Sequence, residues 1–273
     1  MLLYPKKWQK NGISQYIYTL ISRDEFRPST NLVICKSTAK EFLENSKPKL
    51  ETYTARYYET ILNSYKYTGH TVNSTLLSFY LDLKNLTREP SATLGNLDKD
   101  IGVQEMGIAV FSHDKLIGEL TKEESIYYLI LNNALKSCTI QVPNPNNSNK
   151  TIDLLVTLKN KTKSKIDIVN GSPYITSNIS IDANILSMDE QSRQYNIQEL
   201  QEHVSNYLQS EIQKFCYRTS KEFGVDIIGF GEYEVKNYLF YDDWKNSNWL
   251  ANYKNVSFGI KVKTIVKPSY LLN

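Results

Sequence analysis

One long amphipathic helix near the C-terminus constrains the fold of this chain more than any other feature. Between Ile197 and Phe223, one helical face carries Leu200, Val204, Leu208, Ile212, Phe215, Thr219 and Phe223. Asn196 and Glu199 suit the N-cap and N3 positions, and Gly224 suits the residue after the helix end. About 27 helical residues form a rod of roughly 40 Å. A helix of this kind buries its apolar stripe against another element.

Segments on both sides of this helix alternate apolar and polar residues, which is typical of strands with one buried face. The apolar members are Ile152, Leu154, Val156 and Leu158, then Ile175, Ile179, Ile181, Ala183 and Ile185, and finally Val256, Phe258, Ile260, Val262 and Val266. We therefore expect an α+β fold. Its C-terminal antiparallel sheet packs on the long helix, and smaller mixed α/β units precede it.

Turn and loop signals divide the chain into three predicted stretches. Residues 1–100 are expected to form an incomplete N-terminal mixed domain, with a linker at 89–91 and 95–100. Residues 101–148 are expected to form a hairpin-helix unit, with a polar turn at 112–115 and a capping box of Thr121 and Glu124 at the start of the helix. The Asn- and Pro-rich segment 143–150 predicts a loop, and 149–273 is the predicted sheet-plus-helix domain.

The charge balance argues against a dedicated nucleic-acid binder. The formal net charge is +3, and 22% of the residues are charged, so no strongly basic surface is expected. The densest basic run contains Lys159, Lys161, Lys163 and Lys165. On a hairpin these alternate residues share one face, which we expect to be solvated. The alternative is contact with an acidic or membrane surface.

No cofactor site is predicted. Cys35, Cys138 and Cys216 are far apart, without a C-x-x-C motif, and the three histidines lack metal-ligand spacing. The motif of Gly229, Phe230 and Gly231 lacks the third glycine of G-x-G-x-x-G and any P-loop lysine. We interpret it as a tight bend after a short strand at 225–228. We therefore expect no metal, nucleotide or redox cofactor.

No residues have the spacing of a catalytic group, so the chain is predicted not to be an enzyme. The adjacent carboxylates of Asp242 and Asp243 precede Trp244 and are interpreted as charges at a helix N-terminus. Trp244 and Trp249 lie in a polar segment. We expect them to pack on the core, and the alternative is an exposed binding platform.

Several of these pieces occur in an order that resembles a known family. The string GIAVFSHDKLIGELTKEES forms the predicted hairpin and helix start, and the long helix, VDIIGFGEYEV, the two tryptophans and the last alternating strand follow it. Across 103–266 this order resembles the C-terminal region of the Ger(x)C family, the C subunits of spore germinant receptors. Residues 26–100 are similar to that family's N-terminal domain.

The resemblance implies a lipoprotein on the outer face of the spore inner membrane of Firmicutes, which acts with the A and B membrane subunits of a nutrient germinant receptor. It implies protein–protein contacts and no catalytic residues. Its motif residues are structural or interaction candidates: Asp226, Gly229, Phe230, Gly231, Trp244 and Trp249. A secreted or surface module that binds a peptide or carbohydrate is the alternative function, with the tryptophans as its platform.

One departure from the family concerns the N-terminus. Members normally begin with a signal peptide and an acylated lipobox cysteine, whereas MLLYPKKWQKNG has neither feature. The isoleucine before Cys35 and the lack of an apolar segment upstream also make that cysteine unsuitable. We therefore expect an N-terminally truncated or atypically short member, soluble as this fragment.

Overall fold

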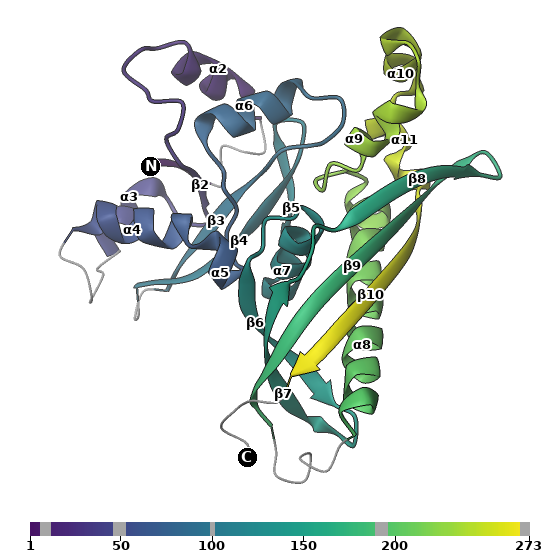
Figure 1. Cartoon of the computed structure of the whole chain (residues 1–273). Helices are drawn as coiled ribbons and strands as arrows, with labels where there is room; N and C mark the ends of the chain where they lie inside the picture. The colour runs from purple at the N-terminus through teal and green to yellow at the C-terminus, as the bar shows by residue number, and fades with distance from the viewer. Residues whose placement is uncertain (6–11, 46–52, 99–101, 189–195, 268–273) are drawn as a thin grey trace. The chain divides into compact units, whose positions relative to one another are not determined.

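The computed structural model describes residues 1–5, 12–45, 53–98, 102–188 and 196–267 (Figure 1). The chain forms two units. The first consists of residues 1–65, 70–125 and 223–254, and the second of residues 66–69, 126–222 and 255–273. Neither unit is continuous in sequence, so both cut across the division into 1–100, 101–148 and 149–273. That division stays a prediction about which segments fold independently.

A five-stranded sheet organises the first unit. Its strands are β1 (Leu2–Pro5), β2 (Leu32–Cys35), β3 (Ser91–Asp98), β4 (Gly102–Ser112) and β5 (Lys115–Leu120), in that spatial order. The β1–β2 and β2–β3 pairs are parallel, and the β3–β4 and β4–β5 pairs are antiparallel. The predicted hairpin is therefore confirmed as β4–β5, and its turn places His113 at φ 54°.

Helices cover both faces of this sheet because β2 is apolar on both sides. Leu32 faces one cluster, which includes Phe79. The helices of that side are α2 (Ser14–Ile21) and α6 (Leu76–Lys84). Val33 faces a second cluster, which includes Phe42. The helices there are α3 (Ala39–Asn45) and α4 (Thr54–Asn63), and the single-turn helix α5 (Tyr65–Thr68) follows. Strands buried on both faces are typical of sheets with parallel pairs.

The predicted linker at 89–91 and 95–100 is wrong at Ser91 and at 95–98, because Ser91–Asp98 form strand β3. Residues 99–100 lie outside the described residues. This strand has backbone partners on both sides, β2 and β4. Gly95 lies under the ring of Phe42, where an added Cβ would come within 2.8 Å of a ring carbon. Its sequence mixes small, polar and apolar residues, so the two neighbouring strands determine the conformation more than its own periodicity does.

The second unit contains the predicted sheet and long helix. Strands β6 (Ser137–Asn144), β7 (Asn147–Leu158), β9 (Ser172–Ser187) and β10 (Ser257–Lys267) follow the order β10-β9-β7-β6, and β8 (Lys163–Val169) also pairs with β9. Three of the pairs are antiparallel. In Figure 1, β9 and β10 cross in front of helix α8 (Ile197–Tyr217). The predicted antiparallel sheet on a long helix is confirmed.

One pair in this sheet, β9–β10, is parallel. It is parallel because α8 returns the chain to the end of the sheet at which β9 began. The predicted stripe is buried from Leu200 to Thr219, and its last member, Phe223, is half-buried. Ile179, Ile181 and Ile185 of β9 are buried as well. The predicted caps are also confirmed. The Asn196 side chain accepts a hydrogen bond from the Gln198 amide at 2.9 Å, and Gly224 has φ +69° after a final π-helical turn, Arg218–Phe223.

The predicted loop at 143–150 is shorter than expected, because β6 and β7 continue into it and join at Asn144–Asn147. The preceding helix, α7 (Lys122–Leu131), has the predicted capping box. The Thr121 amide donates to Glu124 Oε2 at 2.8 Å, and the Glu124 amide donates to Thr121 Oγ1 at 3.2 Å.

Candidate functional site

Short helices make up the part of the first unit that follows the long helix. They are α9 (Gly231–Glu234), α10 (Tyr241–Ser247) and α11 (Trp249–Asn252), with 3-10 turns at Val235–Asn237 and Tyr253–Asn255. The predicted strand at 225–228 is wrong, because these residues are in no strand. Two backbone amides that follow these residues donate to a carboxylate within them.

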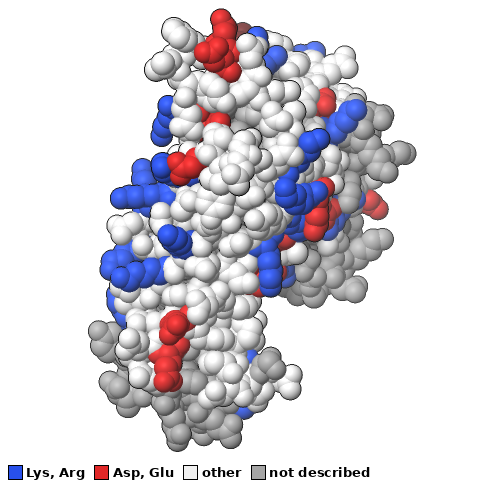
Figure 2. Space-filling model, turned by 90° about the vertical axis from the view of Figure 1, so that its right-hand side faces the viewer, with Lys and Arg blue, Asp and Glu red and all other residues white. Residues whose placement is uncertain are grey.

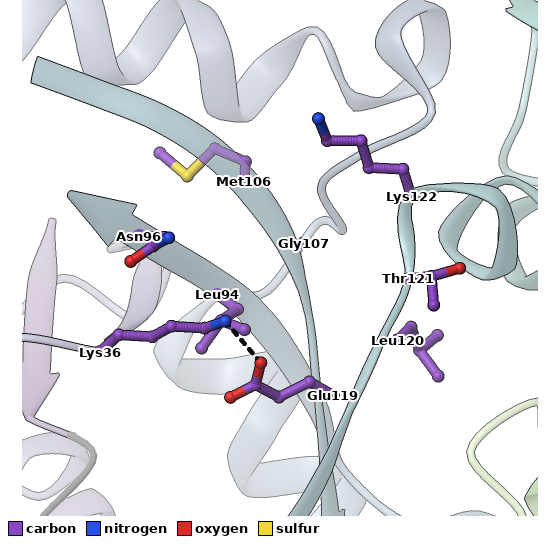
Figure 3. A pocket seen from close by; sticks show the side chains of 9 residues that line it. All are labelled: Lys36, Leu94, Asn96, Met106, Gly107, Glu119, Leu120, Thr121 and Lys122. Atoms are coloured by element: carbon purple, nitrogen blue, oxygen red, sulfur yellow. Dashed lines mark ion pairs between the residues drawn. The ribbon is translucent and has the colours of Figure 1, made fainter. Parts of the chain in front are cut away.

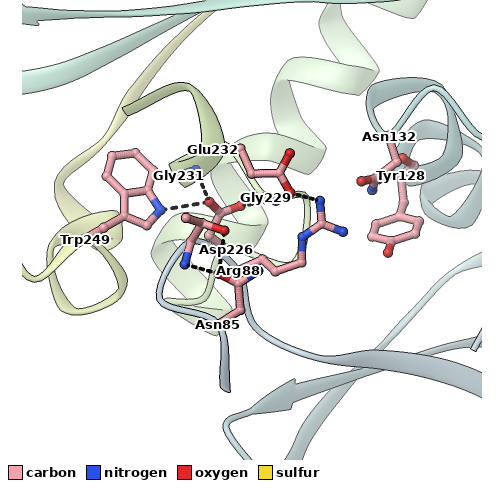
Figure 4. Close-up of polar contacts among 10 residues, drawn as sticks. Asn85, Arg88, Tyr128, Asn132, Asp226, Gly229, Gly231, Glu232 and Trp249 are labelled. Atoms are coloured by element: carbon pink, nitrogen blue, oxygen red, sulfur yellow. Dashed lines mark hydrogen bonds and ion pairs between the residues drawn. The ribbon is translucent and has the colours of Figure 1, made fainter. Parts of the chain in front are cut away.

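That carboxylate belongs to Asp226, which is fully buried (Figure 4). The Gly229 amide donates to its Oδ1 at 2.7 Å, and the Gly231 amide donates to its Oδ2 at 2.9 Å. The indole Nε1–H of Trp249 also donates to Oδ2, at 2.8 Å. Together with the buried Phe230 between the glycines, these residues form what we call the Asp226 cluster. It ties the start of the segment to its end, 23 residues later.

Both glycines of the cluster are required, for different reasons. Gly229 has φ +87°, a conformation that side chains disfavour. A Cβ there would lie 2.6 Å from Nη2 of Arg88, the end of a flexible side chain. A Cβ on Gly231 would lie 2.5 Å from the Thr87 carbonyl oxygen and 2.7 Å from the Trp249 ring. The bend predicted from the glycine motif is therefore present, with the left-handed residue at Gly229.

An ion pair lies at the edge of the cluster. Arg88 Nη2 is 2.6 Å from Glu232 Oε1, and both side chains are partly exposed. Asp82 of α6 is close enough to respond to both charges. The pKa of Asp82 is raised to about 6, mainly by burial, with Arg88 acting to lower it and Glu232 to raise it. Figure 4 shows Arg88 and Glu232 pointing toward one another beside the buried carboxylate.

Glu89 connects the cluster to the β4–β5 hairpin. Its backbone amide donates to the Asp226 carbonyl at 2.8 Å. Its side chain accepts a hydrogen bond from the His113 amide at 2.6 Å, in the hairpin turn. Burial raises the pKa of Glu89, and this hydrogen bond lowers it. Two motifs more than 100 residues apart are thus joined by a residue that the sequence analysis assigned to a linker.

The chemistry of the Asp226 carboxylate is structural. Burial raises its pKa, whereas the hydrogen bonds from Gly231, Trp249 and Gly229 lower it. Both oxygens are already accepting from N–H groups of the protein. Because the group is enclosed, it has no surface from which to exchange a proton with a substrate. The cluster therefore fixes the backbone shape of this segment.

The other tryptophan lies outside the cluster. Trp244 packs against Tyr238, with ring centroids 5.8 Å apart. Trp244 and Trp249 are each only 4% exposed, so the prediction that they pack on the core is confirmed. The alternative of a tryptophan binding platform is wrong, because neither ring face is available to a ligand. The predicted helix-terminal role of the acidic pair is confirmed, since Asp242 and Asp243 lie in the first turn of α10.

A pocket of about 280 Å³ with a mixed polar and apolar lining lies on the sheet of the first unit (Figure 3). It is lined by Lys36, Leu94, Asn96, Met106, Gly107, Glu119, Leu120, Thr121 and Lys122. Lys36 Nζ and Glu119 Oε2 form an ion pair at 2.7 Å within it. These two charges therefore neutralise one another, and the pocket shares no residue with the Asp226 cluster.

The described parts of the chain contain neither a metal-ligand cluster nor a membrane-spanning helix. Within the described ranges, no three His, Cys, Asp or Glu side chains gather in an arrangement that could hold a metal ion. The absence of a cofactor stays a prediction. No helix within those same ranges is both long and apolar enough to cross a bilayer.

Comparison with known proteins assigns this architecture. Residues 106–269 match the family described as spore germination B3/GerAC-like, C-terminal. This chain belongs to that family. Residues 1–96 match the spore germination protein N-terminal domain, which starts earlier in the chain than the resemblance at 26–100 indicated. The predicted Ger(x)C resemblance is confirmed, and membership supports a role in spore germination as a germinant receptor C subunit.

Individual relatives agree with the family match. "Spore germination protein GerQC" of Bacillus cereus is 22% identical over 276 residues, which cover 98% of this chain and 74% of the relative. The crystal structure of the GerBC protein superposes with a TM-score of 0.72 at 14% identity, over 97% of this chain and 78% of that one. The structural neighbour confirms the α+β fold of this GerAC-like chain.

Three charged residues near the cluster were missed by sequence reasoning: Arg88, Glu89 and Glu232. The signal for Arg88 and Glu89 was the polar run Thr-Arg-Glu-Pro, and Glu232 directly follows the glycine motif. The structure brings five of the six predicted residues together and leaves Trp244 apart. That these residues serve the family's function stays a proposal.

Proposed function

We propose that this GerAC-like chain supports nutrient germination through protein contacts, as the partner of the A and B membrane subunits of a germinant receptor, and catalyses no reaction. It would act at the outer face of the spore inner membrane. Family membership supports the general role. The observation that carries the contact function is an exposed apolar tip on the segment closed by the Asp226 cluster.

The tip consists of Leu239, Phe240 and Tyr241, which are 94%, 70% and 67% exposed. Single exposed apolar residues are ordinary, but three large ones in succession are typical of an interaction site. Leu239 and Phe240 lie between the 3-10 turn at 235–237 and helix α10, and Tyr241 is the first residue of that helix. The Asp226–Trp249 hydrogen bond holds the two ends of the segment, so the tip is presented on a closed loop.

Charges beside the tip specify the partner further. Asp242 and Asp243 are exposed and follow the tip directly. Neither has an ion pair among the described residues. A protein surface with an apolar recess and a basic rim would complement this arrangement. An anionic membrane surface would repel the two carboxylates, which favours a protein partner for the tip.

Membrane residence would come from acylation upstream of this sequence. One acyl chain gives only marginal and reversible membrane binding. Contacts with the membrane subunits would therefore add stability to the anchoring. In this proposal the tip contributes to retention in the receptor as well as to signalling.

Deletion of the gene tests the role in germination. Spores without it should fail to germinate with the nutrient, yet germinate normally with an agent that bypasses receptors. Normal nutrient germination, in a strain without a paralogous receptor for that nutrient, would contradict the proposal.

Substitution at the tip tests the contact function. Phe240→Glu should lower recovery of the A and B subunits with the tagged chain at least tenfold and should slow nutrient germination. Leu81→Glu is the matched control, because Leu81 is another largely exposed apolar residue of the same unit. Equal recovery with both variants, at unchanged melting temperature, would place the contact elsewhere.

A further inference from the structure

Lysine side chains cover the outward face of the sheet in the second unit. We define the lysine face as Lys163 and Lys165 of β8 with Lys261, Lys263 and Lys267 of β10. Lys163 and Lys261 are both paired with Asn178 of β9, from opposite sides, so these three residues form one row across three strands. The inward residues of the same strands are buried, so the lysines project away from the core.

The centre of this face has uncompensated charge. At its ends, Lys165 pairs with Asp167 at 2.6 Å and Lys267 with Asp182 at 3.0 Å. Lys163, Lys261 and Lys263 are exposed and form no ion pair within the described residues. The exposed Lys159 and Lys161 in the preceding turn add charge of the same sign. Figure 2 shows basic side chains gathered along its left margin, the side of the molecule that faces the reader in Figure 1.

The residues between the lysines are small and polar. Thr176, Asn178 and Ser180 occupy the outward positions of β9. Stable protein interfaces are usually anchored by aromatic and arginine side chains and are depleted in lysine. This face has no arginine among its described residues. Its aromatic residue, Tyr174, lies over Gly259, where an added Cβ would be 2.2 Å from the tyrosine oxygen.

An exposed apolar hairpin tip adjoins the lysines. Ile168 and Val169 at the end of β8 are 57% and 48% exposed. The turn that follows has positive φ at both Asn170 and Gly171, the type I′ geometry that forms a tight, well-defined hairpin. Basic side chains together with a few exposed apolar ones are characteristic of proteins that bind membranes at the interface. Lysine ammonium groups remain strongly hydrated, which suits lipid headgroups better than a dry protein interface.

We propose that the lysine face binds an anionic lipid surface, with the hairpin tip of Ile168 and Val169 entering the headgroup layer. This is independent of the contact function proposed above, because it rests on residues of the second unit alone. The face would orient the second unit on a membrane by charge. The attraction would fall steeply with ionic strength, because exposed charges are screened by salt.

Vesicle binding by the 273-residue chain tests this directly. Sedimentation is measured with phosphatidylcholine vesicles and with vesicles of three parts phosphatidylcholine to one part phosphatidylglycerol, at low and high salt. We expect binding only to the anionic vesicles, and loss of it at high salt. Replacing Lys163, Lys261 and Lys263 by glutamine should lower the partition coefficient at least tenfold, on the order expected for three surface lysines.

The control variant replaces Lys40, Lys115 and Lys245, three exposed lysines of the first unit, by glutamine. It changes the net charge equally and should bind the anionic vesicles like the parent chain. Ile168→Ser with Val169→Ser should weaken binding that persists at moderate salt. Equal binding to both vesicle types, or equal loss in both lysine variants, would overturn the proposal. Binding to soluble polyglutamate without binding to vesicles would also overturn it and would indicate an acidic protein partner.

Discussion

At the scale of single residues, the Asp226 carboxylate accepts backbone hydrogen bonds that a strand or helix would otherwise satisfy. Burying a carboxylate without a cation costs free energy unless N–H groups donate hydrogen bonds to it. Here two backbone amides and one indole N–H meet that requirement. The glycines are therefore needed because of this acceptor.

The two glycines should respond differently to alanine. Gly231→Ala forces a methyl group against the Thr87 carbonyl and the Trp249 ring, an overpacking that costs about 1–3 kcal/mol. Gly229→Ala adds backbone strain of about 1–2 kcal/mol, but displaces only the flexible Arg88 guanidinium. Urea unfolding should show both variants destabilised. Gly107→Ala is the control, since its Cβ would meet only ordinary contacts, and an unchanged Gly231→Ala would contradict this account.

Asp82 should make stability depend on pH. Because burial raises its pKa to about 6, the folded chain keeps a proton that the unfolded chain has lost in the weakly acidic range. The contribution of Asp82 to stability therefore decreases as the pH rises toward 6 and is constant above it. Asp82→Asn removes this loss. At pH 7.5 the free energy of unfolding of the variant should therefore exceed that of the parent by up to about 3 kcal/mol.

Thermal unfolding of parent and variant at pH 4.5 and 7.5 measures this difference. It should shrink at the lower pH, where Asp82 is protonated in the folded protein. Asp24→Asn, at an exposed position, should leave the melting temperature unchanged at both values. A difference for Asp82→Asn that does not vary with pH would rule out the ionisation of Asp82 as its cause.

At the scale of elements, helix α8 does more than cover the sheet, because its polar side chains also bind the free edge of β10. Ser205 Oγ accepts from the Thr264 amide at 3.1 Å, and Gln201 Oε1 accepts from the Val266 amide at 3.1 Å. Gln209 binds the Val262 amide in the same way at 3.4 Å. Spaced by four, these residues form a polar row beside the apolar stripe. An edge strand capped in this way cannot pair with another chain.

Removing one cap should destabilise the second unit. Ser205→Ala leaves the Thr264 amide without its acceptor, which costs about 1–3 kcal/mol. Ser210→Ala is the same substitution on the exposed face of the same helix. It should lower the free energy of unfolding by only a few tenths of the loss in Ser205→Ala. Amide hydrogen exchange gives a second measurement. The Thr264 amide should exchange faster in Ser205→Ala alone, and equal exchange in both variants would contradict the capping role.

At the scale of the whole molecule, the chain order does not match the units. The first unit needs residues 223–254, and the second needs β10, which follows them. Val225, Ile227, Ile228 and Phe230 are buried, so residues 1–125 alone would leave the partners of these side chains exposed. A folding unit built from distant segments has a high contact order and forms late.

Joining the separated segments should restore the first unit. We expect residues 1–125 expressed alone to unfold without a cooperative transition. The same residues linked by a flexible glycine–serine linker to residues 223–254 should unfold cooperatively. Circular dichroism during heating distinguishes them. A cooperative transition for 1–125 alone would show that the last segment is dispensable for this fold.

The sequence by itself determined the elements whose pattern is local. The stripe of α8, the alternation in β9 and β10, the capping box at Thr121 and the bend at the glycine motif were all predictable. Each depends on residues within a few positions of one another. The family resemblance was also contained in the order of these local motifs.

Only the tertiary structure decided the features that depend on distant partners. Strand β3 forms because β2 and β4 lie on either side of it, and the β9–β10 pair is parallel because of the path of α8. Residues 225–228 form no strand, and Asp226 accepts hydrogen bonds from the amides of Gly229 and Gly231 and from the distant Trp249 indole. Glu89 joins this segment to the β4–β5 hairpin. Such contacts arise between residues far apart in the chain, so hydrophobic periodicity and turn propensity carry no signal for them.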